Sequence, residues 1–145
     1  MHGRVVEVAL RTDHRRLEEQ VGRSDIGLSM VGVEYQPDER WRGVIHPLAL
    51  ESVHRRAVLL WKPLVNWKHA LATLERMRRY AVELGYSVPD EEVAEVWRVF
   101  DAQPLDMQRG MLDRLARSAM GGQGLREEAI RRIGSAQGTV SPPDL

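Results

Sequence analysis

Apolar residues take every second position in much of the first 46 residues, which predicts β-strands with one buried face. Val6, Val8 and Leu10 follow this period and predict a first strand. Residues 13–21 predict a short helix that stops at Gly22. Residues 1–46 are therefore expected to form the β-rich part of the chain.

The alternation changes phase near Gly32. The apolar positions on its two sides are Ile26, Leu28, Met30, Val31, Val33 and Tyr35. A shift of one residue beside a glycine predicts a strand interrupted by a β-bulge. Residues 36–39, which include Pro37, predict a turn, and residues 41–46 predict the returning strand.

From Pro47 onward the apolar period becomes helical. Proline suits the first turn of a helix, so we expect one helix over residues 47–61, broken at Pro63. A long helix over residues 64–84 is expected to close at Gly85, and Ser87 is the expected N-cap of the next. Two more helices are expected over residues 105–119 and 125–133.

Strands followed by helices predict an α+β fold, with a small N-terminal antiparallel sheet packed on a C-terminal layer of four to five helices. A compact helical bundle that carries the sheet as an appendage is the alternative. The length of 145 residues fits one domain. We place this domain at residues 1–134, with residues 47–134 as its helical part and residues 135–145 as a disordered tail.

The composition, 43% hydrophobic and 29% charged, is typical of a soluble globular protein. No apolar run approaches the ~18–20 residues that cross a bilayer, and the N-terminus has no signal-peptide core. We therefore expect a cytoplasmic protein without a membrane partner. Cysteine is absent, which excludes disulfides and thiolate chemistry. The spacing of His46, His54 and His69 matches no metal signature, so we expect neither a metal nor a cofactor.

Positive charge gathers in residues 40–80, although the whole chain has a net charge of zero. This segment carries nine Lys or Arg and two acidic residues, a net charge of +7, and three of the four tryptophans. Residues 1–39 carry −3 and residues 81–145 carry −4. The segment favours an anionic partner, either nucleic acid or an acidic protein surface, unless the acidic flanks cover it in the fold.

One arc of the predicted 64–84 helix is basic. At ~100° per residue, Lys68, His69, Arg76 and Arg79 fall opposite the apolar face. Such an arc can grip a phosphate backbone, although every amphipathic helix has a charged outer face. Arg78 falls within the apolar stripe, so its guanidinium must reach solvent, stack on an aromatic ring, meet a carboxylate or bind a partner.

The remaining candidates are Trp41 with its two neighbouring arginines, and two arginines of the predicted 47–61 helix. An exposed indole between two arginines could stack on a base, whereas indoles on apolar stripes, such as Trp67 and Trp97, are expected in the core. The complete set of candidate binding residues is Arg40, Trp41, Arg42, Arg55, Arg56, Lys68, His69, Arg76, Arg78 and Arg79. The sequence contains no catalytic motif, and we assign no catalytic residue.

These observations favour a small accessory or regulatory protein that uses residues 40–80 to contact nucleic acid. The alternative is a protein-binding modulator or inhibitor that docks on a larger nucleic-acid-handling assembly, such as RNA polymerase or a replication or phage complex. The second alternative is a small enzyme with an unrecognised site. A large exposed apolar patch around Trp41 and Trp61 would indicate the protein-binding role. The lack of a family motif fits a phage or mobile-element protein.

Overall fold

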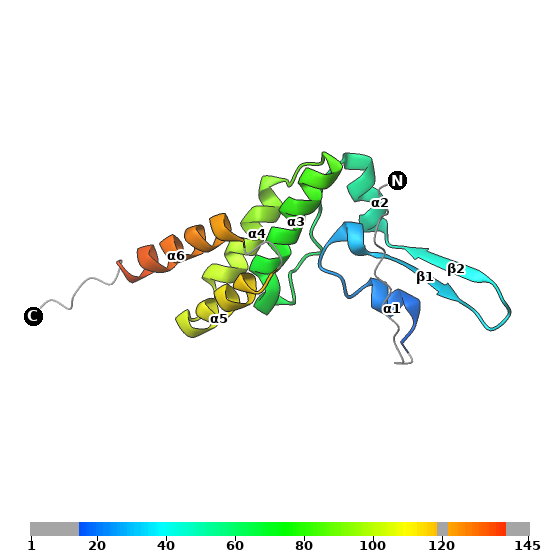
Figure 1. The fold of residues 1–145 in the computed structure, drawn as a ribbon, viewed down its shortest axis with the longest axis horizontal. Helices are drawn as coiled ribbons and strands as arrows, with labels where there is room; N and C mark the ends of the chain where they lie inside the picture. The colour runs from blue at the N-terminus through cyan, green and yellow to red at the C-terminus, as the bar shows by residue number, and fades with distance from the viewer. Residues whose placement is uncertain (1–14, 119–121, 139–145) are drawn as a thin grey trace, which may run out of the picture.

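The computed structural model describes residues 15–118 and 122–138, and these form an α+β arrangement (Figure 1). An antiparallel β-hairpin and two short helices precede a group of four helices. The hairpin lies at one end of the molecule and α6 at the other. The predicted α+β fold is therefore confirmed. The predicted strand around Val6, Val8 and Leu10 lies outside the described residues.

The hairpin consists of β1 (Val31–Tyr35) and β2 (Trp41–Ile45), paired in register from Val31↔Ile45 to Tyr35↔Trp41. The predicted turn joins them, with the Gln36 N–H donating to the Arg40 carbonyl at 2.8 Å and Glu39 left-handed at φ 63°. Helix α1 (Leu17–Val21) packs against one face of this hairpin and ends at Gly22, as predicted.

The predicted strand at Ile26, Leu28 and Met30 is wrong. Gly27–Ser29 form the 3-10 helix η1 instead, and the register of β1 runs through Gly32 without a bulge. Gly27 causes the difference, because its N–H donates to the Leu59 carbonyl at 2.8 Å and it lies directly against α2. A tertiary contact therefore decides the conformation that local alternation predicted otherwise.

Helix α2 (Pro47–Arg55) is shorter than predicted. It begins with Pro47 in its first turn, as expected, and ends at Arg56, which is left-handed at φ 51°. Residues 57–60 leave the helix and are buried in extended conformation, with Ala57 bridging Ser87 and Leu60 bridging Ile26. Backbone hydrogen bonds hold this segment outside the helix: the Val58 N–H donates to the Ser87 carbonyl and the Leu59 carbonyl accepts from the Gly27 N–H, both at 2.8 Å.

The helical half contains η2 (Trp67–His69), α3 (Ala70–Leu84), α4 (Asp90–Asp101), α5 (Leu105–Ala116) and α6 (Gln123–Gln137). Gly85 closes α3 at φ 66°, as predicted. Several bounds differ from the prediction: α3 starts at residue 70, Pro89 rather than Ser87 is the N-cap of α4, and α5 ends at Ala116. Helix α6 starts at Gln123 rather than at residue 125 and includes residues 135–137 of the predicted tail.

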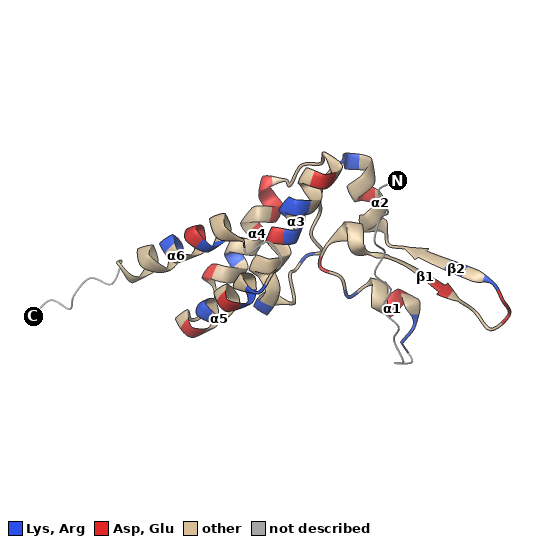
Figure 2. Ribbon diagram, in the orientation of Figure 1, with Lys and Arg blue, Asp and Glu red and all other residues tan. Residues whose placement is uncertain are grey.

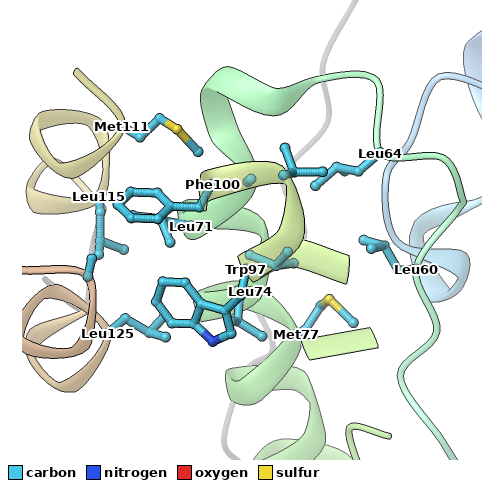
Figure 3. Packing of buried hydrophobic residues seen from close by; sticks show 14 of the residues in the cluster. Leu60, Leu64, Leu71, Leu74, Met77, Trp97, Phe100, Met111, Leu115 and Leu125 are labelled. Carbon is cyan, nitrogen blue, oxygen red and sulfur yellow. The ribbon is translucent and has the colours of Figure 1, made fainter. Parts of the chain in front are cut away.

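The main hydrophobic core lies between α3, α4, α5 and α6 (Figure 3). Phe100 and Trp97 of α4 meet at 5.7 Å between ring centroids, edge to face, and Leu71 and Leu74 of α3 are fully buried. Leu60 from the extended segment belongs to the same cluster. The core therefore ties the first half of the chain to the helices, and the predicted burial of Trp97 is confirmed.

A second, smaller cluster lies under the hairpin. Val21 of α1, Met30 and Ala49 of α2 are buried there, with Leu17 and Val44 packed against them. This cluster covers only the face of the hairpin that points toward α1, which leaves the opposite face without a covering element among the described residues.

Candidate protein-docking surface

The face of the hairpin opposite α1 is apolar and exposed. We call it the outer face, and its members are Val31, Val33, Tyr35, Trp41 and Ile45. Their side chains are between 49% and 73% exposed, and Trp41 has the highest value. No charged side chain belongs to this face, because its remaining paired position is Gly43.

The outer face follows from the strand period. Side chains alternate between the two faces of a strand, so positions 31, 33 and 35 share a face with their partners 45, 43 and 41. The Gln36–Arg40 backbone bond makes these three cross-strand pairs the non-hydrogen-bonded ones, whose side chains lie closest. Tyr35 and Trp41 accordingly form a tilted ring pair, with centroids 5.1 Å apart at 54°.

The inner face of the hairpin carries a charged cluster instead. Arg42 donates to the Glu18 carboxylate of α1 and, through Nε at 2.7 Å, to Glu34 of β1. Hydrogen bonding from Arg42 lowers the pKa of Glu18 from 4.5 to about 2, and the same bond raises the pKa of Arg42. Arg42 therefore anchors α1 to the hairpin.

Two other members of the predicted basic set also have carboxylate partners. Arg40 lies 3.5 Å from Asp38 at the tip of the hairpin. Arg55 lies 3.3 Å from Glu51 and 3.7 Å from Glu91 of α4. Arg56, at the end of α2, is exposed and makes no ion pair with any residue of the described ranges. Carboxylates thus pair with both arginines of the hairpin and with Arg55 of α2, but not with Arg56.

The cations of α3 and η2 are different. Lys68, His69, Arg76, Arg78 and Arg79 make no ion pair with another residue of 15–118 or 122–138. Lys68 Nζ lies 5.6 Å from the Trp67 ring centroid, and Arg79 lies 5.7 Å from that of Tyr80. Arg76 donates to Thr73 Oγ1 at 3.5 Å. The Asp25 carboxylate lies close enough to Arg76 and His69 to interact with them electrostatically, so the charge of this group is partly compensated.

The buried part of the apolar stripe of α3 is shorter than the helical period predicts. Leu71, Leu74 and Met77 are fully buried, but Val82 is 84% exposed. Arg78 is exposed as well, so it reaches solvent rather than entering the core. Near the C-terminal end of α3 the core no longer covers the stripe, which removes the packing conflict that the sequence predicts for Arg78.

The ten predicted binding residues do not form one patch. Figure 2 shows basic residues at the hairpin tip, at the end of α2 and along α3, separated by acidic and uncharged residues. Of the ten, only Trp41 belongs to the outer face. Val31, Val33, Tyr35 and Ile45 were not among the predicted site residues; their alternation identifies a strand face, while the position of α1 decides which face stays exposed.

A separate polar cluster lies where α3 meets the loop after α1. Asp25 accepts a hydrogen bond from Thr73 Oγ1 at 3.3 Å, and burial raises the pKa of Asp25. Asp25 also lines an open hollow of about 770 Å³ together with Trp61 and Asn66. None of the three histidines in residues 40–80 lines this hollow, although His69 lies close enough to Asp25 to lower its pKa.

The chain matches no known protein-family model, no curated protein and no solved structure.

The described residues show neither a metal site nor a membrane-spanning helix. These contain no group of three or more His, Asp or Glu side chains placed to hold a metal ion. Their helices are all too short or too polar to cross a membrane.

Proposed function

We propose that this protein is a protein-binding module and that the outer face is its docking surface. The observation that supports it is the uninterrupted apolar face around Trp41, the most exposed member at 73%. Apolar patches of this kind mark interaction sites, and Tyr and Trp are enriched at the energetic centre of interfaces. Burying these five side chains against a partner would remove their apolar area from water.

The chemistry of the outer face favours a protein over a phosphate backbone. The electrostatic affinity for a phosphate backbone comes from Lys and Arg side chains, and the outer face has none. The loop beside it carries Asp38 and Glu39 together with Arg40, so its net charge is negative. An apolar partner surface fits this face better than a polyanion.

The test compares two matched variants in capture experiments from source lysate. Trp41→Ser removes the largest side chain of the outer face, and Val82→Ser removes an apolar side chain of α3 that is even more exposed, at 84%. We expect a saturable protein partner to bind the wild type and Val82→Ser equally and Trp41→Ser at least ~10-fold more weakly, as for an interface hot spot. Nuclease treatment should leave the capture unchanged. Equal capture by both variants, or loss of capture with nuclease, would falsify the docking role.

Nucleic-acid binding is a second candidate, favoured by the arginines of α3, which form no ion pair within the described part of the chain. Arg76 and Arg79 lie three residues apart on one side of the helix, with His69 two turns before Arg76. A phosphate backbone along this side would give affinity that falls with salt, by about 0.9 log unit per log unit of salt for each phosphate contact.

Fluorescence anisotropy with single-stranded and duplex oligonucleotides tests this candidate. Replacing Arg76 and Arg79 with alanine should reduce the salt slope by about one for each phosphate that the variant no longer neutralises. Arg98→Ala is the control, since Arg98 is already paired with Glu95 at 2.7 Å. Failure of every probe to bind at low salt eliminates the nucleic-acid candidate and leaves the docking proposal intact.

A further inference from the structure

We infer that the partner seated on the outer face is a second copy of this chain, packed face to face about a twofold axis. The inference rests on the proposed function, because it requires the outer face to be a docking surface. A twofold interface brings the same patch of both copies together, so the patch must complement itself in shape and charge. The outer face meets both conditions.

The outer face combines a large exposed side chain with a position that has no side chain. Trp41 projects from β2, and the next residue on the same face of β2 is Gly43, which has no side chain. A Cβ built on Gly43 would have the Gly32 carbonyl oxygen as its nearest neighbour, at 3.8 Å, so the space above it is open. The indole of one copy can therefore enter the gap that Gly43 leaves in the other.

The area of the outer face suits a weak, reversible dimer. The Tyr35 and Trp41 rings are both more than half exposed and contribute on the order of 250 Å². With the three aliphatic side chains, the outer face reaches about 500 Å², within the range of functional patches on monomers. Two copies would bury about 1,000 Å², the lower end for a specific interface.

Charge does not oppose this contact. The outer face is uncharged, and the whole chain has a net charge of zero. Two neutral copies do not repel one another, and a net charge near zero promotes association. A dimer held by apolar contacts should persist at high salt, in contrast to one held by surface ion pairs.

Analytical ultracentrifugation of the full chain tests the inference. We expect the apparent mass to rise from the monomer value of 16.6 kDa toward twice that value between about 1 μM and about 1 mM, a range that covers weak association. Trp41→Ser should stay monomeric throughout, whereas the control Val82→Ser should associate like the wild type. Gly43→Val has room for its side chain in the monomer and should weaken association at least ~10-fold by filling the gap.

Four outcomes would overturn the inference. The first is a chain that stays monomeric at every concentration while Trp41-dependent capture of another protein persists; the proposed function then stands with a different partner. The second is a monomer that gains association only when Val8 is replaced by Asp, which assigns the face to the N-terminal segment of the same chain. The third is association that survives Trp41→Ser, which places the dimer contact elsewhere. A monomer without any Trp41-dependent capture removes both proposals.

Discussion

Lys62 Nζ lies 2.9 Å from Glu92 Oε1, and this ion pair joins the loop after α2 to helix α4. The other carboxylate oxygen of Glu92 accepts a hydrogen bond from the Leu60 N–H, also at 2.9 Å. The Glu92 side chain is only 5% exposed, while Lys62 is 41% exposed. A carboxylate buried this deeply needs its partners, because an unpaired buried charge is strongly unfavourable. Glu92 therefore fastens the extended segment that carries Leu60 to the helical half.

Replacing Glu92 should destabilise the whole fold. Glu92→Ala leaves the buried Leu60 N–H without an acceptor and Lys62 without its partner, so we expect the free energy of unfolding to fall by about 2–4 kcal/mol. Urea denaturation followed by circular dichroism measures it. The neighbouring Glu91→Ala is the control, because Glu91 is exposed and its 3.7 Å contact with Arg55 should be worth less than about 1 kcal/mol. Equal destabilisation in both variants would contradict this role for Glu92.

The ion pair between Glu18 and Arg42 should make the attachment of α1 sensitive to acid. The pKa of Glu18 is lowered from 4.5 to about 2, so the folded state holds its proton less tightly than the unfolded state. The stability from this pair is fully present above pH 4.5 and is lost as the pH falls toward 2. The stability difference between wild type and Glu18→Gln should therefore be constant at neutral pH and shrink across that window.

Thermal unfolding of both proteins between pH 2 and pH 7 measures that difference, across the window that the pKa of Glu18 defines. Glu19→Gln, one residue along α1 and outside the ion pair, is the control. A difference that stays constant down to pH 2 would rule out a lowered pKa for Glu18.

Local pattern was enough to predict the hairpin and most helices. The alternation around Val33 and the turn at Pro37 identify two paired strands, because one strand period and one turn signal suffice for a hairpin. The Gly85 stop and the burial of Trp97 follow equally from local signals: a left-handed cap favours glycine, and an indole on an apolar stripe is usually core. None of these predictions needs a contact with a distant residue.

The candidate site depended on contacts that no local pattern contains. Arg42 reaches a carboxylate 24 residues earlier in the chain, so a count of charges in residues 40–80 overstates the free charge there. Residues 57–60 continue the helical apolar pattern but bridge Ile26 and Ser87 instead. The exposure of Trp41 follows from α1 packing on the opposite face of the hairpin, which alternation alone does not determine.

Because η1 lies so close to α2, replacing Gly27 with alanine should destabilise the fold. A Cβ at Gly27 would lie 2.7 Å from Ser52 Oγ, 2.8 Å from Leu48 Cγ and 3.0 Å from the Leu48 carbonyl oxygen. Since part of this contact is helix backbone, α2 must shift, and we expect Gly27→Ala to cost about 1–3 kcal/mol of unfolding free energy. Gly43→Ala, whose Cβ has open space, should change stability by less than about 0.5 kcal/mol. Chemical denaturation measures the unfolding free energy of both variants. Similar destabilisation in the two would refute the packing argument.

Arg132 should hold α6 against the core through two contacts. Its guanidinium lies 4.4 Å from the Trp97 ring centroid, and Nη1 donates to Asp101 at 2.8 Å. Arg132→Ala removes both contacts, so we expect α6 to open more readily, by about 1–2 kcal/mol. Hydrogen exchange of the α6 amides measures this opening, and the exchange of α3 amides should change less, because local opening need not involve the whole core. The adjacent Arg131→Ala is the matched control, because Arg131 is exposed and its removal should leave exchange nearly unchanged. If both variants speed exchange of α6 equally, Arg132 contributes no more than any exposed arginine of that helix.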